Sequence, residues 1–512
     1  MSRQSSNDLH TLIRALTQAE KRYVKLYLRR HVLGNENQSE VLFDAIAAQE
    51  VYDEPSIRAR HAGSGFVKRL SEAKRELMSS ILKAMRMFHA EADREREAWS
   101  LYFDADFLRD RGLRDLAIKK VEETINLGES INDHALVAKA RQMRRRISEM
   151  DDDISEIEEN PLESPAVLAA SALKDHVFYE TLSRRMRSVV ARYGQTPGPE
   201  AKRLAELILS HATSYGEPRT IDSRVVWLRI LSIKSFYIDA DINTSVNYDL
   251  ERLRLFERDP RFKKERFNAY TALLHSTAVR LISAHRLSES RELIAVLHEL
   301  RSNPPFRMTP YDRTSLGESI LTVEALYHLN SPDKVTEANI AELETLYDEV
   351  EPAMSSSLRL PNLFNLGFLR TLRGDYKDAL RLLNRCLEVR DTQRRDAHYA
   401  ARMLRIIIHH TLDHTSVVES LIRSDRRARA KTEPLREDEE IFYSTLSRLS
   451  TSPNPPRRRA ILREAADKLD ALTGRSGQGY TTALFDFASW CRSVVERRPW
   501  CDVLSERLAS SV

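Results

Sequence analysis

The sequence is poor in the residues on which most sheet-containing folds depend. Only 14 of its 512 residues are glycine, whereas the turns and phosphate-binding loops of doubly wound sheets, sandwiches and propellers need residues that adopt positive φ. The three cysteines, Cys386, Cys491 and Cys501, form no Cys-x-x-Cys pair, so a disulfide framework or a thiolate zinc site has no support. These absences favour an all-α chain in a reducing compartment.

Long apolar runs and a secretory signal are also absent. Ile406, Ile407 and Ile408 are followed at once by His409 and His410, whereas a transmembrane helix needs about 20 predominantly apolar residues. The first eight residues have neither the basic start nor the apolar core of a signal peptide. We therefore expect a cytoplasmic protein that has no membrane partner.

The residues that are plentiful are those of a folded, charge-balanced chain. Hydrophobic residues make up 42% of the sequence and charged residues 30%, and 80 basic side chains against 76 acidic ones leave a net charge of +4. This composition is typical of globular proteins and not of disordered ones. At about 150 residues per domain, the length predicts roughly three compact regions.

Helix start and stop signals recur along the chain. Thr17 and Glu20 have the spacing of a capping box, in which each side chain bonds a backbone N–H group that the first turn leaves unpaired. Ser164-Pro165 opens another helix, which we expect to end near Gly194. Apolar residues at three- and four-residue steps over 66–90 predict the longest helix of the chain.

The stretch 363–387 carries a pattern with a physical reason at each position. Leu366-Gly367 supplies a small residue where one helix approaches the next, Gly374-Asp375-Tyr376 turns the chain, and Ala379 packs at the helix crossing. The remaining apolar positions of the pattern are Leu363, Leu383 and Cys386. Together these residues resemble a tetratricopeptide repeat, a pair of antiparallel helices.

Two weaker units carry part of the same pattern. One spans 99–125, with Ala105, Gly112 and Ala117 at matching offsets, and the other spans 278–297. The resemblance implies an all-α helical-repeat solenoid, in which stacked helix pairs build an extended concave surface.

A second resemblance covers both ends of the chain. Residues 9–23, 42–46 and 485–490 are similar to an uncharacterised family of large bacterial helical proteins. This resemblance implies one continuous bacterial helical protein, and it brings no catalytic or binding residue with it.

The repeats and the polar breaks between them predict four regions. Residues 1–92 are expected to form an N-terminal helical bundle, and 93–160 a first tetratricopeptide-like hairpin followed by an acidic linker. Residues 161–350 are expected to hold central helical repeats, and 351–512 a C-terminal tetratricopeptide-like and helical region.

Aromatic side chains are the candidates for contacting a partner. Many peptide-binding members of the repeat family hold a carboxylate with Lys and Asn, but Phe364 and Phe368 occupy the matching positions here. With Leu372 they would line an apolar concave face suited to a hydrophobic helix or peptide. Alternatively, both phenylalanines pack against the next helix pair. The corresponding candidates in the weaker unit are Trp99, Tyr102 and Arg109.

Basic clusters offer an alternative, nucleic-acid-binding surface. Residues 401–463 contain 13 basic and 8 acidic side chains, and phosphate groups bind such an excess of positive charge. The arginines that would carry this contact are Arg426, Arg427, Arg457, Arg458 and Arg459. The acidic run 437–440 interrupts the surface, so solvated helix faces explain these clusters as well.

Two further motifs suggest chemistry only weakly. His410 and His414 are one helical turn apart with Asp413 beside them, a spacing that permits a metal site, although a helix C-terminus also favours histidine. The glycine-rich stretch 474–479 lacks the Lys-Ser/Thr of a phosphate-binding loop and follows a helical segment where that motif needs a strand.

The sequence therefore favours a non-enzymatic protein–protein interaction scaffold or adaptor that presents a helical-repeat groove to a protein or peptide. It contains no nucleophile with a base at fixed spacing and no cofactor fingerprint, so we expect no cofactor. The alternative is a nucleic-acid-associated regulatory factor, and a His-Asp metalloenzyme is a third interpretation.

Overall fold

The computed structural model confirms the all-α class. It describes residues 7–30, 37–89, 94–148, 160–193, 198–258, 263, 266–306, 308–389, 395–429, 435–452, 454–473 and 486–510. Within these ranges the chain forms 24 α-helices and no strand. None of the described helices has both the length and the apolar character needed to cross a membrane.

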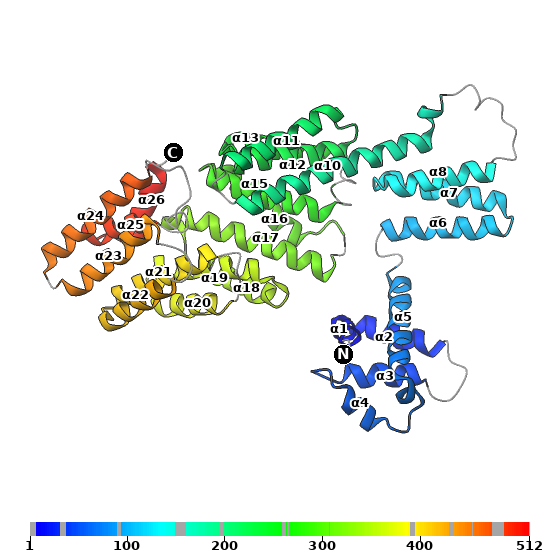
Figure 1. The fold of residues 1–512 in the computed structure, drawn as a ribbon, viewed down its shortest axis with the longest axis horizontal. Coiled ribbons are helices and arrows are strands. Elements are labelled where there is room, and N and C mark those ends of the chain that lie inside the picture. Colours follow the sequence, from blue (N-terminus) through cyan, green and yellow to red (C-terminus); the bar gives the residue numbers. More distant parts are fainter. Residues whose placement is uncertain are drawn as a thin grey trace. The chain divides into compact units, whose positions relative to one another are not determined.

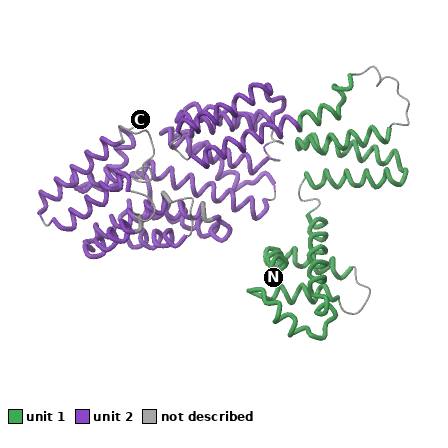
Figure 2. Tube along the Cα trace, in the orientation of Figure 1, with its two compact units in different colours: residues 1–173 green, residues 174–512 purple. Residues whose placement is uncertain are grey.

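The chain divides into two compact units, residues 1–173 and 174–512 (Figure 2). The helices of the first unit are α1 (Asp8–Ala15), α2 (Gln18–Arg30), α3 (Gln38–Ala47), α4 (Glu54–Arg60), α5 (Leu70–Phe88), α6 (Arg94–Asp110), α7 (Arg114–Ser130) and α8 (His134–Ser148). Helix α10 (Pro165–Tyr193) runs across the boundary between the units. The four regions expected from the sequence stay a prediction.

The second unit holds the remaining helices. They are α11 (Pro199–Tyr215), α12 (Ile221–Tyr237), α13 (Ile242–Arg258), α15 (Phe267–Ser283), α16 (Leu287–Ser302), α17 (Pro310–Leu329), α18 (Glu337–Val350), α19 (Ser356–Arg373), α20 (Tyr376–Glu388), α21 (Arg395–Thr411), α22 (Thr415–Arg429), α23 (Glu437–Thr451), α24 (Pro455–Thr473), α25 (Phe487–Glu496) and α26 (Trp500–Ser510).

Local helix signals are confirmed in most places. The Thr17 N–H donates to Glu20 at 2.7 Å and the Glu20 N–H donates to the Thr17 hydroxyl at 3.3 Å, which completes the capping box. Helix α10 begins at Pro165, as predicted, and ends at Tyr193. The acidic run of the expected linker, 149–159, and the glycine-rich stretch 474–479 lie outside the described residues.

The prediction of the longest helix is wrong. Residues Gly65–Arg69 form a 3₁₀ turn, and α5 begins only at Leu70 and has 19 residues, whereas α10 has 29. The apolar period was detected correctly, because Leu70, Leu77 and Ile81 are buried in the core that α1–α5 share. Periodicity reports which face is buried and does not separate a 3₁₀ turn from the α-helix that it leads into.

The helices between α12 and α22 contact each other in a regular order (Figure 1). Helix α12 packs on α13, α15 on α16, α19 on α20 and α21 on α22. Helix α13 also packs on α15, and alternate helices make contact as well, since α15 packs on α17, α17 on α19 and α19 on α21. Each hairpin is therefore covered by the next one along the chain, and α17–α26 share one large hydrophobic core.

Small residues allow the two helices of a hairpin to approach closely. In α19–α20, a Cβ on Gly367 would lie 3.0 Å from two atoms of the Leu383 side chain. Ala379, twelve residues after Gly367, is completely buried on the partner helix. The hairpins α6–α7 and α15–α16 repeat this twelve-residue spacing with the fully buried pairs Ala105/Ala117 and Ala278/Ser290.

The turn inside each of these hairpins has the same geometry. Gly112, His285 and Gly374 lie seven residues after the first small residue and adopt φ of 72°, 56° and 81°. In each turn the next residue donates its N–H to a carbonyl five residues earlier, as Asp375 does to Arg370 at 2.9 Å. This is the bonding pattern of a Schellman motif, which caps the first helix and reverses the chain.

Two further hairpins place Asn or Asp at the same turn position. Asn132 between α7 and α8 and Asp413 between α21 and α22 have φ of 55° and 57°. Asn and Asp tolerate the left-handed region because their short polar side chains bond locally. A search for turn glycines misses these two positions for that reason.

Replacing Gly374 tests the turn. The Gly374→Val substitution should lower the free energy of unfolding by about 1–2 kcal/mol, because a β-branched residue is strained at positive φ. A Cβ at this position would meet no atom within 4 Å, so the loss would come from the backbone alone. Urea denaturation followed by circular dichroism measures it. Gly374→Asn serves as the matched control and should lose less than half as much; equal losses would contradict the assignment.

Candidate functional site

The aromatic residues expected to line a concave groove in α19 are buried. Phe364, Phe368 and Leu372 are 1%, 3% and 8% exposed. The ring of Trp500, on α26, lies 5.4 Å from the ring of Phe368. The expectation of an open apolar face at these residues is therefore corrected, because all three are buried and Trp500 of α26 packs against Phe368. The alternative of internal packing agrees with the structure.

The candidates of the weaker unit lie on α6 and are partly exposed. Trp99 and Tyr102 are half-buried with their rings 5.8 Å apart. The Arg109 guanidinium forms ion pairs with Asp106 and Asp110, each at 2.8 Å. Tyr102 packs on the core of α6–α8, so only part of this set faces solvent.

Two phenylalanines that the sequence analysis did not select are the most exposed aromatic residues on α6. Phe103 is 61% exposed and Phe107 59%. They follow Trp99 at steps of four residues, and the rings of Trp99 and Phe103 lie 6.2 Å apart. The Arg111 guanidinium lies 5.1 Å from the centre of the Phe107 ring. We call Trp99, Phe103, Phe107 and Arg111 the aromatic ridge.

The five arginines of the nucleic-acid alternative differ in exposure and in their hydrogen-bond partners. Arg426 donates to Glu440 at 2.6 Å. Arg458 is partly buried, with its guanidinium 3.3 Å from His410 Nε2. Arg427, Arg457 and Arg459 are exposed. Two of the five arginines, Arg426 and Arg458, therefore already have partners within the protein.

The candidate metal ligands of α21 and α22 do not converge. His414 Nδ1 lies 3.1 Å from His409 Nδ1, whereas His410 faces Arg458 and the ring of Trp490. In the described parts of the chain, no group of three or more His, Cys, Asp or Glu side chains is placed to hold a metal ion. His410 instead lines a cavity of about 360 Å³.

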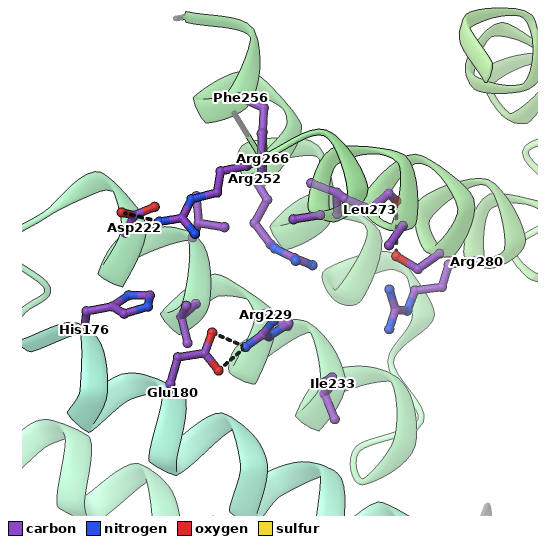
Figure 3. A pocket seen from close by; sticks show the side chains of 15 residues that line it. His176, Glu180, Asp222, Arg229, Ile233, Arg252, Phe256, Arg266, Leu273 and Arg280 are labelled. Carbon is purple, nitrogen blue, oxygen red and sulfur yellow. Dashed lines mark hydrogen bonds and ion pairs between the residues drawn. The ribbon is translucent and has the colours of Figure 1, made fainter. Parts of the chain in front are cut away.

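A second cavity, of about 320 Å³, is lined by four arginines, two of which are buried (Figure 3). Four elements build it, namely α10, α12, α13 and α15 with the residue that precedes it. Its charged lining residues are His176, Glu180, Asp222, Arg229, Arg252, Arg266 and Arg280. We call this space the arginine cavity. Thr220 helps to place one wall, because its hydroxyl accepts the Ser223 N–H and so caps the start of α12.

A single buried carboxylate accepts hydrogen bonds from two arginines that line the cavity. Asp249, on α13, is completely buried. Its Oδ1 accepts a hydrogen bond from Arg252 at 2.8 Å, and its Oδ2 accepts one from Arg280. Arg252 and Arg280 are only 7% and 8% exposed. Two buried guanidinium groups therefore share one negative charge.

The other two arginines of the cavity each have a carboxylate of their own. Arg229 donates to both oxygens of Glu180, at 2.8 and 2.9 Å, and Arg266 lies 3.5 Å from Asp222. The cavity and Asp249 thus combine four guanidinium groups with three carboxylates, a surplus of one positive charge.

Burial and crowding with like charges both act on Arg252. Burial is the main reason why its pKa falls to about 10; Asp249 opposes this fall, and the positive charges of Arg229 and Arg280 contribute to it. Among the described residues, the Nε atoms of Arg252 and Arg280 and the Nδ1 atom of His176 are buried without a hydrogen-bond partner. Buried polar atoms normally have partners, so these three require an explanation.

No sequence motif predicts this cavity. Its arginines come from three elements and are separated by 14 to 51 positions, so no fixed spacing relates them. The only available signal is that Asp249 and Arg252 lie on the apolar face of a helix together with Val246 and Phe256. Charged residues at core positions of a helix are unusual and indicate pairing or function.

Substitutions at Asp249 and Arg252 should have unequal effects on stability. Asp249→Asn leaves two buried cations without a counter-charge, and we expect a loss of about 3 kcal/mol or more in the free energy of unfolding. Arg252→Met leaves the Asp249–Arg280 pair intact and removes the surplus charge, so it should cost less than about 1 kcal/mol or stabilise the protein. Urea denaturation compares them. Equal losses would show that Arg252 is not surplus.

The environment of His410 predicts a pH dependence of stability. Burial, together with the charge of Arg458, lowers the pKa of His410 to about 4 against the opposing effect of Asp413, whereas an unfolded histidine has a pKa of about 6.5. Between these values the unfolded chain binds a proton that the folded chain does not. The free energy of unfolding should therefore fall as the pH drops from 7 toward 4, by on the order of 2 kcal/mol from this group.

His410→Gln isolates this contribution from that of the other histidines, of which the chain has 14. Urea midpoints measured at pH 7 and pH 5 should differ less in His410→Gln than in the original protein. An identical pH dependence in the two proteins would contradict the assignment.

The comparisons with known proteins add no family to these observations. No protein-family model matches the chain. A search of curated proteins finds no match either. The tetratricopeptide-like repeat and the bacterial helical family therefore stay predictions from the sequence, and the candidate sites stand on geometry.

Proposed function

We propose that this protein is a non-enzymatic cytoplasmic adaptor, a tetratricopeptide-like helical-repeat protein that binds a protein partner through the aromatic ridge on α6. The observation that carries the proposal is the exposure of Phe103 and Phe107, at 61% and 59%. Exposed aromatic rings that lie on one side of a helix are the feature of the described chain best suited to contact another protein.

Support for the helical-repeat part comes from the hairpins. Three of them share a pair of small buried residues twelve positions apart and a left-handed turn residue seven positions after the first. Alternate helices of the second unit also stack on one another. Both features are expected when helix pairs are stacked into a solenoid.

Support for the partner contact comes from the residue types of the ridge. Trp and Arg are enriched among the residues that dominate binding energies, and aromatic residues are enriched in interface cores. Residues Trp99, Phe103 and Phe107 recur every four positions, so a partner that lies along α6 would contact all three. Burying a phenylalanine completely contributes about 1.5–3 kcal/mol.

The nucleic-acid alternative keeps one favourable observation, the exposure of Arg427, Arg457 and Arg459. Phosphate binding through these residues would weaken steeply as salt rises, because binding releases counterions. Docking of a partner on apolar rings would depend little on salt.

Capture of partners by the full-length tagged protein from its native cytoplasm tests the proposal. We expect a defined protein that remains bound after nuclease treatment and a high-salt wash. The double variant Phe103→Ala/Phe107→Ala should bind this protein at least about tenfold more weakly, because it loses two apolar anchors.

Tyr311→Ala provides the matched control, since Tyr311 is 71% exposed on α17 and does not belong to the ridge. This variant should bind as the original protein does. Equal binding by the double variant would contradict the ridge. Recovery of nucleic acid that is lost in Arg457→Ala/Arg459→Ala would favour the alternative instead.

A further inference from the structure

We propose that the arginine cavity binds a small organic anion, a molecule that carries a carboxylate or phosphate group and an apolar portion. This proposal does not rest on the partner contact at the ridge, because the ridge belongs to residues 1–173 and the cavity to residues 174–512.

The first argument is the imbalance of charge. Four guanidinium groups meet three carboxylates around the cavity, and two of the guanidinium groups are almost completely buried. Burying a charge without full compensation is unfavourable, so a purely structural network would balance Asp249 with one arginine. An anion bound beside Arg252 and Arg280 would supply the missing negative charge.

The second argument is the direction of the donors. In Figure 3 the guanidinium groups of Arg252 and Arg280 extend from different helices toward the interior of the cavity. Asp249 accepts a hydrogen bond from only one nitrogen, Nη1, of each of these guanidinium groups, so their Nη2 groups have N–H donors left for a ligand. Carboxylate and phosphate oxygens accept such hydrogen bonds, and guanidinium groups bind them with two parallel bonds.

The third argument is the size and lining of the space. A volume of about 320 Å³ lies at the lower end of the range found for sites that bind small organic molecules. Val226, Ile233 and Leu273 line the cavity together with the charged residues. An organic anion could place its apolar portion against the parts of these side chains that line the cavity, which an inorganic ion could not do.

The arrangement also explains how the site is held in place. Glu180 fixes Arg229 through two hydrogen bonds, and Asp249 fixes one nitrogen each of Arg252 and Arg280. The cationic groups are therefore oriented before a ligand arrives, which reduces the entropy lost on binding.

Ligand-observed NMR on the full-length protein tests the proposal with three probes of similar shape. Benzoate carries a carboxylate, phenyl phosphate carries a phosphate, and benzamide is the neutral analogue of benzoate. We expect line broadening for at least one anion and at least tenfold weaker binding of benzamide. The anion that binds more tightly identifies the oxyanion that the site prefers.

Two variants of the cavity and one control complete the test. Arg252→Met removes the surplus cation, and Ala272→Trp places an indole at the exposed edge of the cavity lining, where it needs no change in the core. Each should weaken anion binding at least tenfold. Arg203→Gln, which alters an exposed arginine on α11 paired with Glu200, should bind as the original protein does.

The second cavity variant keeps the test decisive if Arg252→Met alters folding. Absence of binding of both anions by the folded original protein would overturn the proposal. Equal binding of benzamide, or binding that persists in Ala272→Trp, would also overturn it. Loss of anion binding in the ridge variant Phe103→Ala/Phe107→Ala would show that the effect is not local to the cavity and would contradict the proposal.

Discussion

The close approach of paired helices is the constraint on which the rest of this fold depends. Two helices pack at short range only where their crossing holds a side chain of minimal size, and a Cβ on Gly367 would already lie 3.0 Å from Leu383. Each hairpin then needs a turn that reverses the chain within a few residues, which a residue with positive φ supplies. Because one hairpin cannot bury both faces of its helices, its neighbours must cover it, as they do in α17–α26, which share one core.

Polar side chains on a helix that is covered on several sides are buried, so they need hydrogen-bond partners within the protein. Arg370, on α19, meets this requirement, since it bonds Glu337 at 2.5 Å and Glu344 at 2.7 Å. The group around Asp249 does not meet it, because two buried arginines share one carboxylate. The arginine cavity is thus the place where internal charge is unbalanced, and the aromatic ridge is a place where apolar surface is uncovered. The arginine cavity would bind a ligand through charge, whereas the aromatic ridge would bind one through hydrophobic burial.

Features that depend on neighbouring residues could be predicted from the sequence. The capping box at Thr17, the start of α10 at Pro165 and the turn at Gly374 each need only a few adjacent side chains and backbone groups. The turns at Asn132 and Asp413 were missed because their residues are less specific for positive φ than glycine. The 3₁₀ turn before α5 was missed because periodicity does not report the hydrogen-bond pattern.

The sequence by itself determined the all-α class, the starts of α2 and α10 and the spacing of small residues in the hairpins, because these follow from interactions within a few turns of chain. Only the tertiary structure decided which apolar and charged residues are exposed. Phe368 is covered by Trp500, which lies more than a hundred positions away, while Phe103 has no such cover. The arginine cavity likewise joins four elements. The exposure of a side chain and the charge balance around it depend on all of its neighbours in space, and many of those neighbours come from distant parts of the chain.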